Sequence, residues 1–322
     1  MKLSIRVVLL VATSACIDIA PASALKIGAF NVQVFGPTKF SDSTVVATLS
    51  KIVRRYDVVL IQEIRDAAQT VIYSFVGIVN IDSAASGVTY NVTVSPRLGR
   101  TSSKEQYAFI YRTDRFTVLN THLYDDSAAD IFEREPYSVL LRDKQQGVGD
   151  FFLLGIHVKP DDAFNEINNL PLAYDAAKVA LGTDRALLLG DFNAGCSYLT
   201  DSQYKAVALV TDKRFTWLIS SSTDTTTGTS VCAYDRIVSS QGLLSDVVTS
   251  TAGVYLFDKA YGLTSVQTQA VSDHYPVEVN VGGSVAASSE QFVAFSSSVT
   301  EVGVALVLIL VAIFGRLVVC FL

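Results

Sequence analysis

Several common catalytic signatures are missing from this 322-residue sequence, and each absence removes a class of protein. There is no His-Glu-x-x-His helix and no cysteine cluster, which sets zinc hydrolases aside. There is no glycine-rich loop ending in Gly-Lys-Ser or Gly-Lys-Thr, so P-loop nucleotide hydrolases are set aside as well. The absence of a nucleophile-elbow motif weakens the case for a serine hydrolase.

Charged residues are also scarce, at 17%, while apolar residues make up 50%, which excludes a disordered polyelectrolyte. No long Pro, Gly or Ser linker and no internal repeat interrupts residues 25–288, so we expect one large domain there. The formal net charge of −6 does not exclude a nucleic-acid partner. Bound cations and a few placed arginines can offset local repulsion.

Apolar residues concentrate at the two ends of the chain. Residues 1–24 have the charged start, apolar run and small-residue end of a secretory signal peptide. Residues 289–322 read as a spacer and an apolar tail. The small residues at 286–289, where the domain meets the spacer, favour a GPI-anchor signal, and a retained transmembrane helix is the alternative. We therefore expect an extracellular or cell-surface protein that uses the secretory pathway, with an endolysosomal location as a further option.

The four cysteines reduce to one pair. Cys16 would leave with the signal peptide and Cys320 lies in the tail, so Cys196 and Cys232 remain. In a secreted chain the simplest expectation is a single disulfide, and two buried free thiols are the alternative. Asn91, in the order Asn-Val-Thr, is an expected glycosylation acceptor.

Short apolar runs alternate with longer amphipathic stretches. Strands are predicted at 25–32, 58–64, 108–111, 151–158, 186–190 and 277–281, several of them apolar enough to be buried on both faces. Helices are predicted at 43–55, 67–79 and 162–181, and Pro171 should break or kink the last one. Strands outnumber helices, which favours two sheets with helices outside each over one doubly wound sheet.

Polar residues gather where these apolar runs stop. They are amide and carboxylate side chains with two imidazoles, a set that suits a hard cation such as Mg²⁺ beside acid–base groups. The members are Asn31, Glu63, Glu105, His157, Asp191, Asn193, Asp235, Asp273 and His274. Taken singly, each can be read as a turn residue or a structural histidine. The third histidine, His122, has no carboxylate motif around it, and we expect it to be structural.

The order of these motifs resembles the deoxyribonuclease I family. The likeness extends from residue 25 to about residue 281 and includes Gly190-Asp191-Phe192-Asn193 and Ser272-Asp273-His274-Tyr275-Pro276. The other matching segments are 26–32, 54–66 and 232–237. The apolar tail makes the chain similar to the branch with a hydrophobic C-terminal extension. The resemblance implies a four-layer α/β/β/α sandwich and a metal-dependent endonuclease that leaves 5′-phosphate and 3′-hydroxyl ends on double-stranded DNA.

The resemblance also implies residue roles. Asn31 and Glu63 would hold Mg²⁺, with Asp191 and Asn193 at the scissile phosphate or metal and Asp273 supporting the network. Glu105 would orient His157, and Asp235 would orient His274. We take His274 as the base and His157 as the acid, although the sequence leaves their order open.

Family substrate contacts match Arg65, Arg134, Tyr198 and Tyr234. Gln33 stands where the family has an arginine, and Ser103 where it has a stacking tyrosine, so we expect weaker DNA binding with a shallower salt dependence.

A family Ca²⁺ loop maps onto Asp224, Thr226 and Ser230. A second calcium region lacks its small two-cysteine loop, although Asp126, Asp130 and Glu135 could still supply oxygens. The family's actin-binding edge aligns with residues 90–95, where a glycan on Asn91 would obstruct it. We expect a monomer that does not bind actin.

Two other functions stay open. A sphingomyelinase or inositol-phosphate phosphatase would use the same metal-and-histidine core, and a cell-surface binding module could carry a dead site. The Cys196/Cys232 pair and the secretory signal favour the nuclease.

Overall fold

A computed structural model describes residues 24–145 and 147–282. Residues 1–23 of the expected signal peptide (1–24) and the whole of the expected spacer and tail (289–322) lie outside the described residues. Among the helices that are described, none is long and apolar enough to cross a bilayer.

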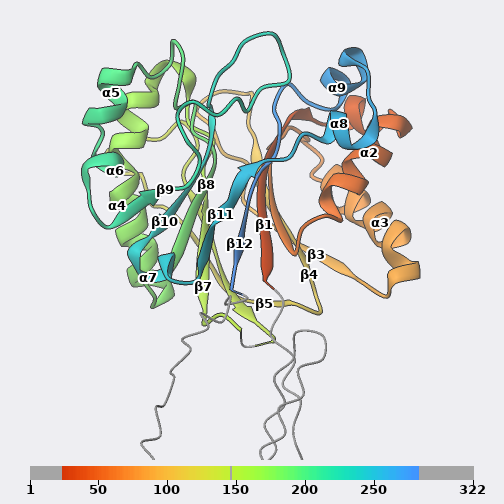
Figure 1. Ribbon diagram of the computed structural model, residues 1–322, viewed down its shortest axis with the longest axis horizontal. Helices are drawn as coiled ribbons and strands as arrows, with labels where there is room; N and C mark the ends of the chain where they lie inside the picture. Colours follow the sequence, from red (N-terminus) through yellow and green to blue (C-terminus); the bar gives the residue numbers. More distant parts are fainter. Residues whose placement is uncertain (1–23, 146, 283–322) are drawn as a thin grey trace, which may run out of the picture. The chain divides into compact units, whose positions relative to one another are not determined.

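Within the described residues, the strands form two six-stranded sheets that pack face to face, with helices outside each (Figure 1). The first sheet has the order β11-β12-β1-β2-β4-β3, and its central pair β1·β2 is parallel. Its strands are β1 (Leu25–Phe35), β2 (Val58–Ile64), β3 (Tyr90–Val94), β4 (Gln106–Arg112), β11 (Val247–Val254) and β12 (Val277–Val281).

The second sheet repeats this plan. Its order is β5-β6-β7-β8-β10-β9, and its central pair β7·β8 is parallel. Its strands are β5 (Phe116–Leu123), β6 (Tyr137–Asp143), β7 (Phe151–Gly155), β8 (Ala186–Asp191), β9 (Phe215–Trp217) and β10 (Asp235–Ser240).

Strands buried on both faces explain the four layers. In β2, Leu60 points into the core between the sheets, while its neighbour Ile61 packs toward the helices outside the first sheet. In β8, Leu187 belongs to the core between the sheets and Leu188 to the core under the helices of the second sheet. Successive strand residues face opposite sides, so a continuous apolar run requires cover on both.

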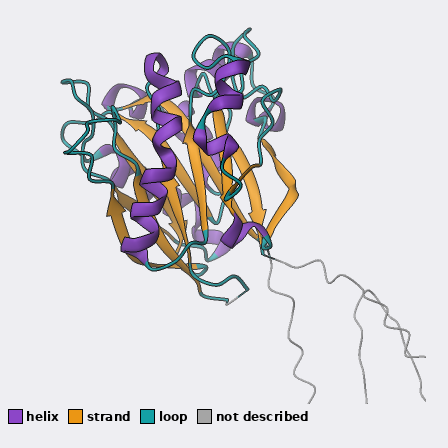
Figure 2. Ribbon diagram, turned by 90° about the vertical axis from the view of Figure 1, so that its left-hand side faces the viewer, coloured by secondary structure: helices purple, strands orange, loops and turns teal. Residues whose placement is uncertain are grey.

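The outer layers are helical, as both views show (Figures 1 and 2). The helices on the side of the first sheet are α1 (Pro37–Phe40), α2 (Ser43–Val53), α3 (Val71–Ser83), α8 (Phe257–Tyr261) and α9 (Ser265–Val271). Those on the side of the second are α4 (Ala163–Leu181), α5 (Asp201–Ala206), α6 (Ala208–Thr211) and α7 (Gln241–Leu244). Two short 3₁₀ turns are η1 (Ala84–Ser86) and η2 (Pro160–Asp162). The predicted four-layer α/β/β/α sandwich is confirmed.

Two local expectations differ from the structure. α4 is not broken at Pro171, which is buried on the packed face of the helix beside Leu170 and Ala173. That burial offsets the one backbone hydrogen bond that proline removes. The expected strand 151–158 is shorter than predicted, because β7 ends at Gly155 and His157 lies in the following loop.

The sheets are tied together where their parallel pairs end. The side-chain amide of Gln62, on β2, donates to the backbone oxygen of Ile156 at 2.7 Å and accepts from the backbone N–H of Asp191 at 3.0 Å. Gly190 makes the approach possible, since a Cβ there would lie 2.3 Å from the backbone oxygen of Ile156. Strand ends from both sheets therefore meet at one edge, where the polar residues lie.

Candidate active site

The first part of the site is built on an irregularity in β1. Pairing with β2 shifts register between Asn31 and Phe35, and Gln33 and Val34 adopt positive φ angles of 49° and 54°. Their N–H groups donate to Asn31 Oδ1 and Glu63 Oε2, both at 2.9 Å. This conformation is costly for a β-branched residue such as Val34. It directs two backbone donors at the side chains expected to hold metal.

Asn31 connects the two sheets. Its Nδ2 atom donates to Glu63 Oε1 and to Asp191 Oδ2, each at 3.0 Å. Asn31 and Asp191 are buried, and the Glu63 side chain is 13% exposed. Carboxylate and amide oxygens of this kind are the ligands that Mg²⁺ prefers, so the residues present fit that ion.

The first imidazole is paired with Glu105. His157 Nδ1 lies 2.8 Å from Glu105 Oε2, and both groups are buried. Burial raises the pKa of Glu105, but the bond to His157 and the charges of Arg134 and Arg65 outweigh it and hold that pKa near 2. Glu105 therefore stays an ionised acceptor that fixes the orientation of the ring.

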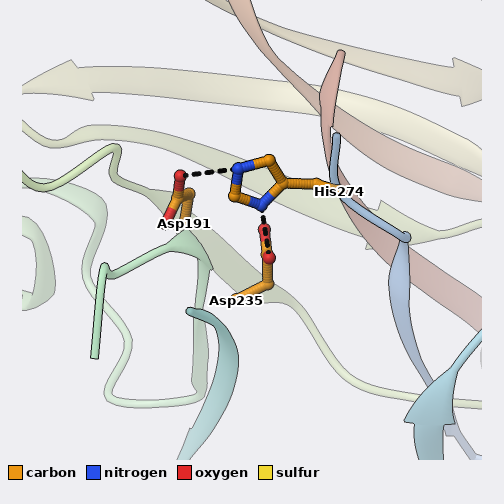
Figure 3. Close-up of side chains that lie close together, drawn as sticks. All are labelled: Asp191, Asp235 and His274. Atoms are coloured by element: carbon orange, nitrogen blue, oxygen red, sulfur yellow. Dashed lines mark hydrogen bonds and ion pairs between the residues drawn. The ribbon is translucent and has the colours of Figure 1, made fainter. Parts of the chain in front are cut away.

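The second imidazole is paired with Asp235 (Figure 3). His274 Nδ1 lies 2.7 Å from Asp235 Oδ2. Burial lowers the pKa of His274, but the carboxylates of Asp235, Asp191 and Asp273 raise it to about 10. The structure therefore favours the imidazolium form of His274 at neutral pH.

Both rings point at the same carboxylate. His157 Nε2 and His274 Nε2 lie 3.5 and 3.6 Å from Asp191 Oδ2. Ligand atoms of Asp191, Asp235 and His274 also lie within 4.8 Å of one another. The structure thus brings both expected pairs to one point.

The remaining expected catalytic side chains lie around this point. The backbone N–H of Asn193 donates to Asp191 Oδ1 at 2.9 Å. Its side-chain Nδ2 atom donates to the backbone oxygen of Val158, also at 2.9 Å. Asp273 Oδ1 lies 3.8 Å from His274 Nε2, and its side chain is half exposed.

The expected substrate residues differ in their accessibility. The rings of Tyr198 and Tyr234 lie 5.3 Å apart, and Tyr234 lies 6.2 Å from the ring of His274, which forms an aromatic rim. Arg65 is partly exposed and forms ion pairs with Glu63 and Glu105.

Arg134 is placed differently, because it is buried. It donates from Nε to the backbone oxygen of His157 at 2.9 Å. Its Nη2 atom has no hydrogen-bond partner among the described residues.

The segment with Asp224, Thr226 and Ser230 forms a tight loop. The Thr226 hydroxyl donates to Asp224 Oδ1 at 2.8 Å or to the backbone oxygen of Ser230 at 2.6 Å. The next residue, Thr227, donates from its backbone N–H to the backbone oxygen of Asp273 at 2.8 Å. The loop is thereby joined to the segment that carries the second imidazole.

The expected disulfide Cys196–Cys232 is present and borders this loop. Its partners lie 36 residues apart in the sequence.

The expected glycosylation acceptor, Asn91, is exposed on β3, an edge strand of the first sheet.

A second oxygen-rich region lies within residues 125–135. Asp126, Asp130 and Glu135 line one pocket. Asp126 Oδ1 and Glu135 Oε2 are buried and lack hydrogen-bond partners among the described residues. Unpaired buried carboxylate oxygens fit a bound Ca²⁺, since such groups are costly when left uncompensated.

Three residues close to the site have contacts for which the sequence predicted no role. Gln62 ties the sheets together, Ser272 donates to the backbone oxygen of Asn31 at 2.7 Å, and Lys39 contacts two backbone segments. The position of Gln62 beside Glu63 was a usable signal. Ser272 opens the motif Ser272-Asp273-His274-Tyr275-Pro276, whereas no sequence pattern marked Lys39.

These features define an enzyme-like centre on a two-sheet sandwich, and the family comparison agrees. Residues 28–274 match the Endonuclease/Exonuclease/phosphatase family, and the chain belongs to it. Within it, the chain is a member of the deoxyribonuclease I group. It is 43% identical to Deoxyribonuclease-1 of Bos taurus over 262 residues, which cover 80% of this chain and 92% of that protein.

Other relatives agree with this placement. The chain is 38% identical to Deoxyribonuclease gamma of Homo sapiens over 273 residues, covering 83% of this chain and 89% of that protein. Among solved structures, D. rerio TDP2 complexed with single strand DNA product aligns with a TM-score of 0.54 at 15% identity, covering 80% of this chain and 98% of that one. The human Nocturnin catalytic domain aligns with a TM-score of 0.52 at 13% identity, covering 80% and 92%. These structural likenesses concern the fold.

Proposed function

We propose that this protein is an endodeoxyribonuclease that hydrolyses phosphodiester bonds of double-stranded DNA by metal-assisted attack of water. The observation that carries the proposal is the meeting of two His–carboxylate pairs at Asp191 Oδ2. Both named relatives at about 40% identity are deoxyribonucleases. Hydrolysis would leave a 5′-phosphate and a 3′-hydroxyl.

The residues that would hold Mg²⁺ are Asn31 and Glu63, supported by Asp191 and Asp273. When bound, the ion supplies positive charge that neutralises the phosphoryl oxygens. Asn193 lies beside Asp191 and is proposed to contact the scissile phosphate, as is Arg134 through its unpaired Nη2 atom.

The two imidazoles would carry the proton transfers. From the sequence we took His274 as the base and left the order of the two rings open. In the protein without bound metal, the carboxylates of Asp235, Asp191 and Asp273 raise the pKa of His274 and favour its imidazolium form, which supports the opposite order. We propose that His274 starts as imidazolium and protonates the leaving 3′ oxygen. As water attacks the phosphorus, His157 takes the proton from that water at Nε2, because the ionised Glu105 holds its Nδ1–H.

A substrate with sulfur in place of the bridging 3′ oxygen tests this order, since sulfur leaves without protonation. The modified DNA should restore cleavage by His274→Ala and not by His157→Ala. The reverse pattern of rescue would return the base role to His274.

The cellular setting is proposed from the sequence together with the disulfide. We propose export through the secretory pathway, a GPI anchor or membrane helix from the tail, a glycan on the exposed Asn91, and structural Ca²⁺ at the two oxygen-rich loops. DNA would contact Arg65, Tyr198 and Tyr234 at the rim. We further propose a monomer that does not bind actin.

Nicking of supercoiled plasmid tests the proposed function. We expect relaxed circles with Mg²⁺, no relaxation with EDTA, and nicks that DNA ligase seals directly, because ligase requires 5′-phosphate and 3′-hydroxyl ends. Glu63→Gln is the control for a contaminating nuclease and should be inactive. Hydrolysis of sphingomyelin or an inositol phosphate without plasmid nicking would contradict the proposal.

A further inference from the structure

Lys39, which is outside the proposed catalytic set, contacts the backbone close to two of the residues proposed for the metal site. Lys39 belongs to α1, and its side chain is half-buried. Its Nζ atom donates to the backbone oxygen of Val32 at 2.7 Å and to that of Val271 at 3.0 Å. Val32 directly follows Asn31, and Val271 lies two residues before Asp273. One ammonium group therefore joins the two backbone segments that carry these side chains.

Both carbonyl groups lie where regular pairing fails. Val32 is within the register shift of β1 against β2. Val271 is the last residue of α9, and the terminal carbonyls of a helix lack partners within it. A cation at this end of a helix is also favoured by the helix dipole. Lys39 thus satisfies two acceptors that the sheet and the helix leave open.

The helix that carries Lys39, α1, is closely packed against the first sheet. A Cβ on Gly36 would lie 2.6 Å from the backbone oxygen of Arg65, so the start of α1 packs closely on the end of β2. Phe40 packs edge-on against Phe35 with ring centroids 6.4 Å apart. The helix that carries Lys39 is therefore held against both central strands of the first sheet.

A second tie runs beside the first. Ser272 Oγ donates to the backbone oxygen of Asn31 at 2.7 Å and accepts from the backbone N–H of His274 at 3.1 Å. Burial lowers the pKa of Lys39 to about 8, and the charges of Asp273 and Glu63 oppose this by favouring the ammonium form. Lys39 and Ser272 thus form two neighbouring links between the backbone at Asn31 and Val32 and the segment that carries Asp273, and Lys39 is the cationic one.

We propose that Lys39 is a positioning residue for the metal site, fixing Asn31, and through it Glu63, relative to Asp273. This inference rests on the proposed function for the identity of the metal site. Groups that orient metal ligands without touching the metal typically change affinity 10–100-fold when they are removed. Lys39 is placed to be such a group.

The test compares Lys39→Met, Lys39→Arg and Lys39→Gln with Lys51→Met. Lys51 is exposed on α2, where its Nζ atom lies over the ring of Tyr261, so its loss controls for removal of one positive charge. Mn²⁺ binding is followed by electron paramagnetic resonance on the full chain without DNA. The binding event that Glu63→Gln abolishes is counted as the catalytic site.

We expect Lys39→Met to raise the Mn²⁺ dissociation constant at that site at least about tenfold. Lys39→Arg should restore part of the affinity, and Lys51→Met should match the wild type. In nicking assays, excess metal should recover kcat while the KM for DNA stays near its original value. Melting in EDTA reports stability separately from metal binding.

An unchanged Mn²⁺ affinity in Lys39→Met, with only a lower melting temperature in EDTA, would overturn the proposal and leave a purely structural tie. If Lys39→Met does not fold, Lys39→Gln is decisive in the same way, because its shorter amide cannot reproduce both contacts. A wild-type protein that binds Mn²⁺ at the Glu63 site but never nicks DNA would instead refute the proposed nuclease function.

Discussion

His157 and His274 direct their Nε2 atoms at the same oxygen, Oδ2 of Asp191, from 3.5 and 3.6 Å. One ring comes from the loop after β7 in the second sheet, and the other from the segment before β12 in the first. Each has its own carboxylate on Nδ1, Glu105 and Asp235 respectively. The arrangement allows one proton to be accepted and another donated across a single phosphate.

The first prediction concerns these rings. His157→Ala and His274→Ala should each lower plasmid nicking by roughly 10²–10⁴-fold, the range expected for loss of a general acid or base. His122→Ala is the matched control, because His122 lies on β5 and should leave nicking unchanged. Circular dichroism checks that all three variants are folded. Near-normal nicking by both site variants would remove the imidazoles from the mechanism.

The second prediction concerns stability in acid. The pKa of Glu105 falls from its usual 4.5 to about 2 in the fold, so its stabilisation is complete above pH 4.5 and is lost as the pH falls through 2. This shift corresponds to about 3 kcal/mol. Urea unfolding from pH 6 to pH 2 should therefore show a shallower acid loss for Glu105→Gln than for the wild type.

Asp161→Asn provides the control for that experiment, because Asp161 is exposed. This variant should follow the wild-type curve. An equally steep acid loss in Glu105→Gln would show that the carboxylate is not the group responsible.

The third prediction concerns calcium at the pocket lined by Asp126 and Glu135. Ca²⁺ at one hundred times its dissociation constant should stabilise the fold by about 2.7 kcal/mol for one site. Asp126→Asn and Glu135→Gln should each lose most of this pocket's contribution to the rise in melting temperature, and Asp224→Asn should reduce the contribution of the other loop. Equal calcium stabilisation in all variants would exclude both sites.

The fourth prediction concerns DNA affinity. Gln33→Arg should add one phosphate contact and steepen the dependence of log K on log salt by about 0.9. Ser103→Tyr should strengthen binding by about 1–3 kcal/mol through stacking, with little change in the salt slope. Fluorescence anisotropy in Ca²⁺ without Mg²⁺ measures both quantities. Unchanged affinity in both variants would mean that neither position faces the DNA.

The sequence predicts the central strands well, because residues such as Leu60 and Leu188 lie in apolar runs that need cover on both faces. It says less about edge strands. β11 is mostly partly buried and mixes small and polar residues, so no periodicity marks it as a strand. The strand ends indicated the polar residues of the site, since active sites gather where strands of a layered fold stop.

Other features depend on contacts that no local pattern encodes. The burial of Arg134 follows from its bond to the backbone of His157. The role of Lys39 follows from two carbonyl groups that are adjacent only after β1 and α9 have packed. Likewise, the raised pKa of His274 results from three carboxylates that come from different segments.

The order in which the strands of the first sheet occur along the chain has a consequence for biosynthesis. Strands β1 to β4 of the first sheet are made early, the whole second sheet follows, and β12 closes the first sheet near the end of the domain. His274 is therefore among the last residues of the site to leave the ribosome. An unfinished chain would hold Asn31 and Glu63 without their partner ring, so translation order itself would keep the nascent protein inactive until the domain is nearly complete.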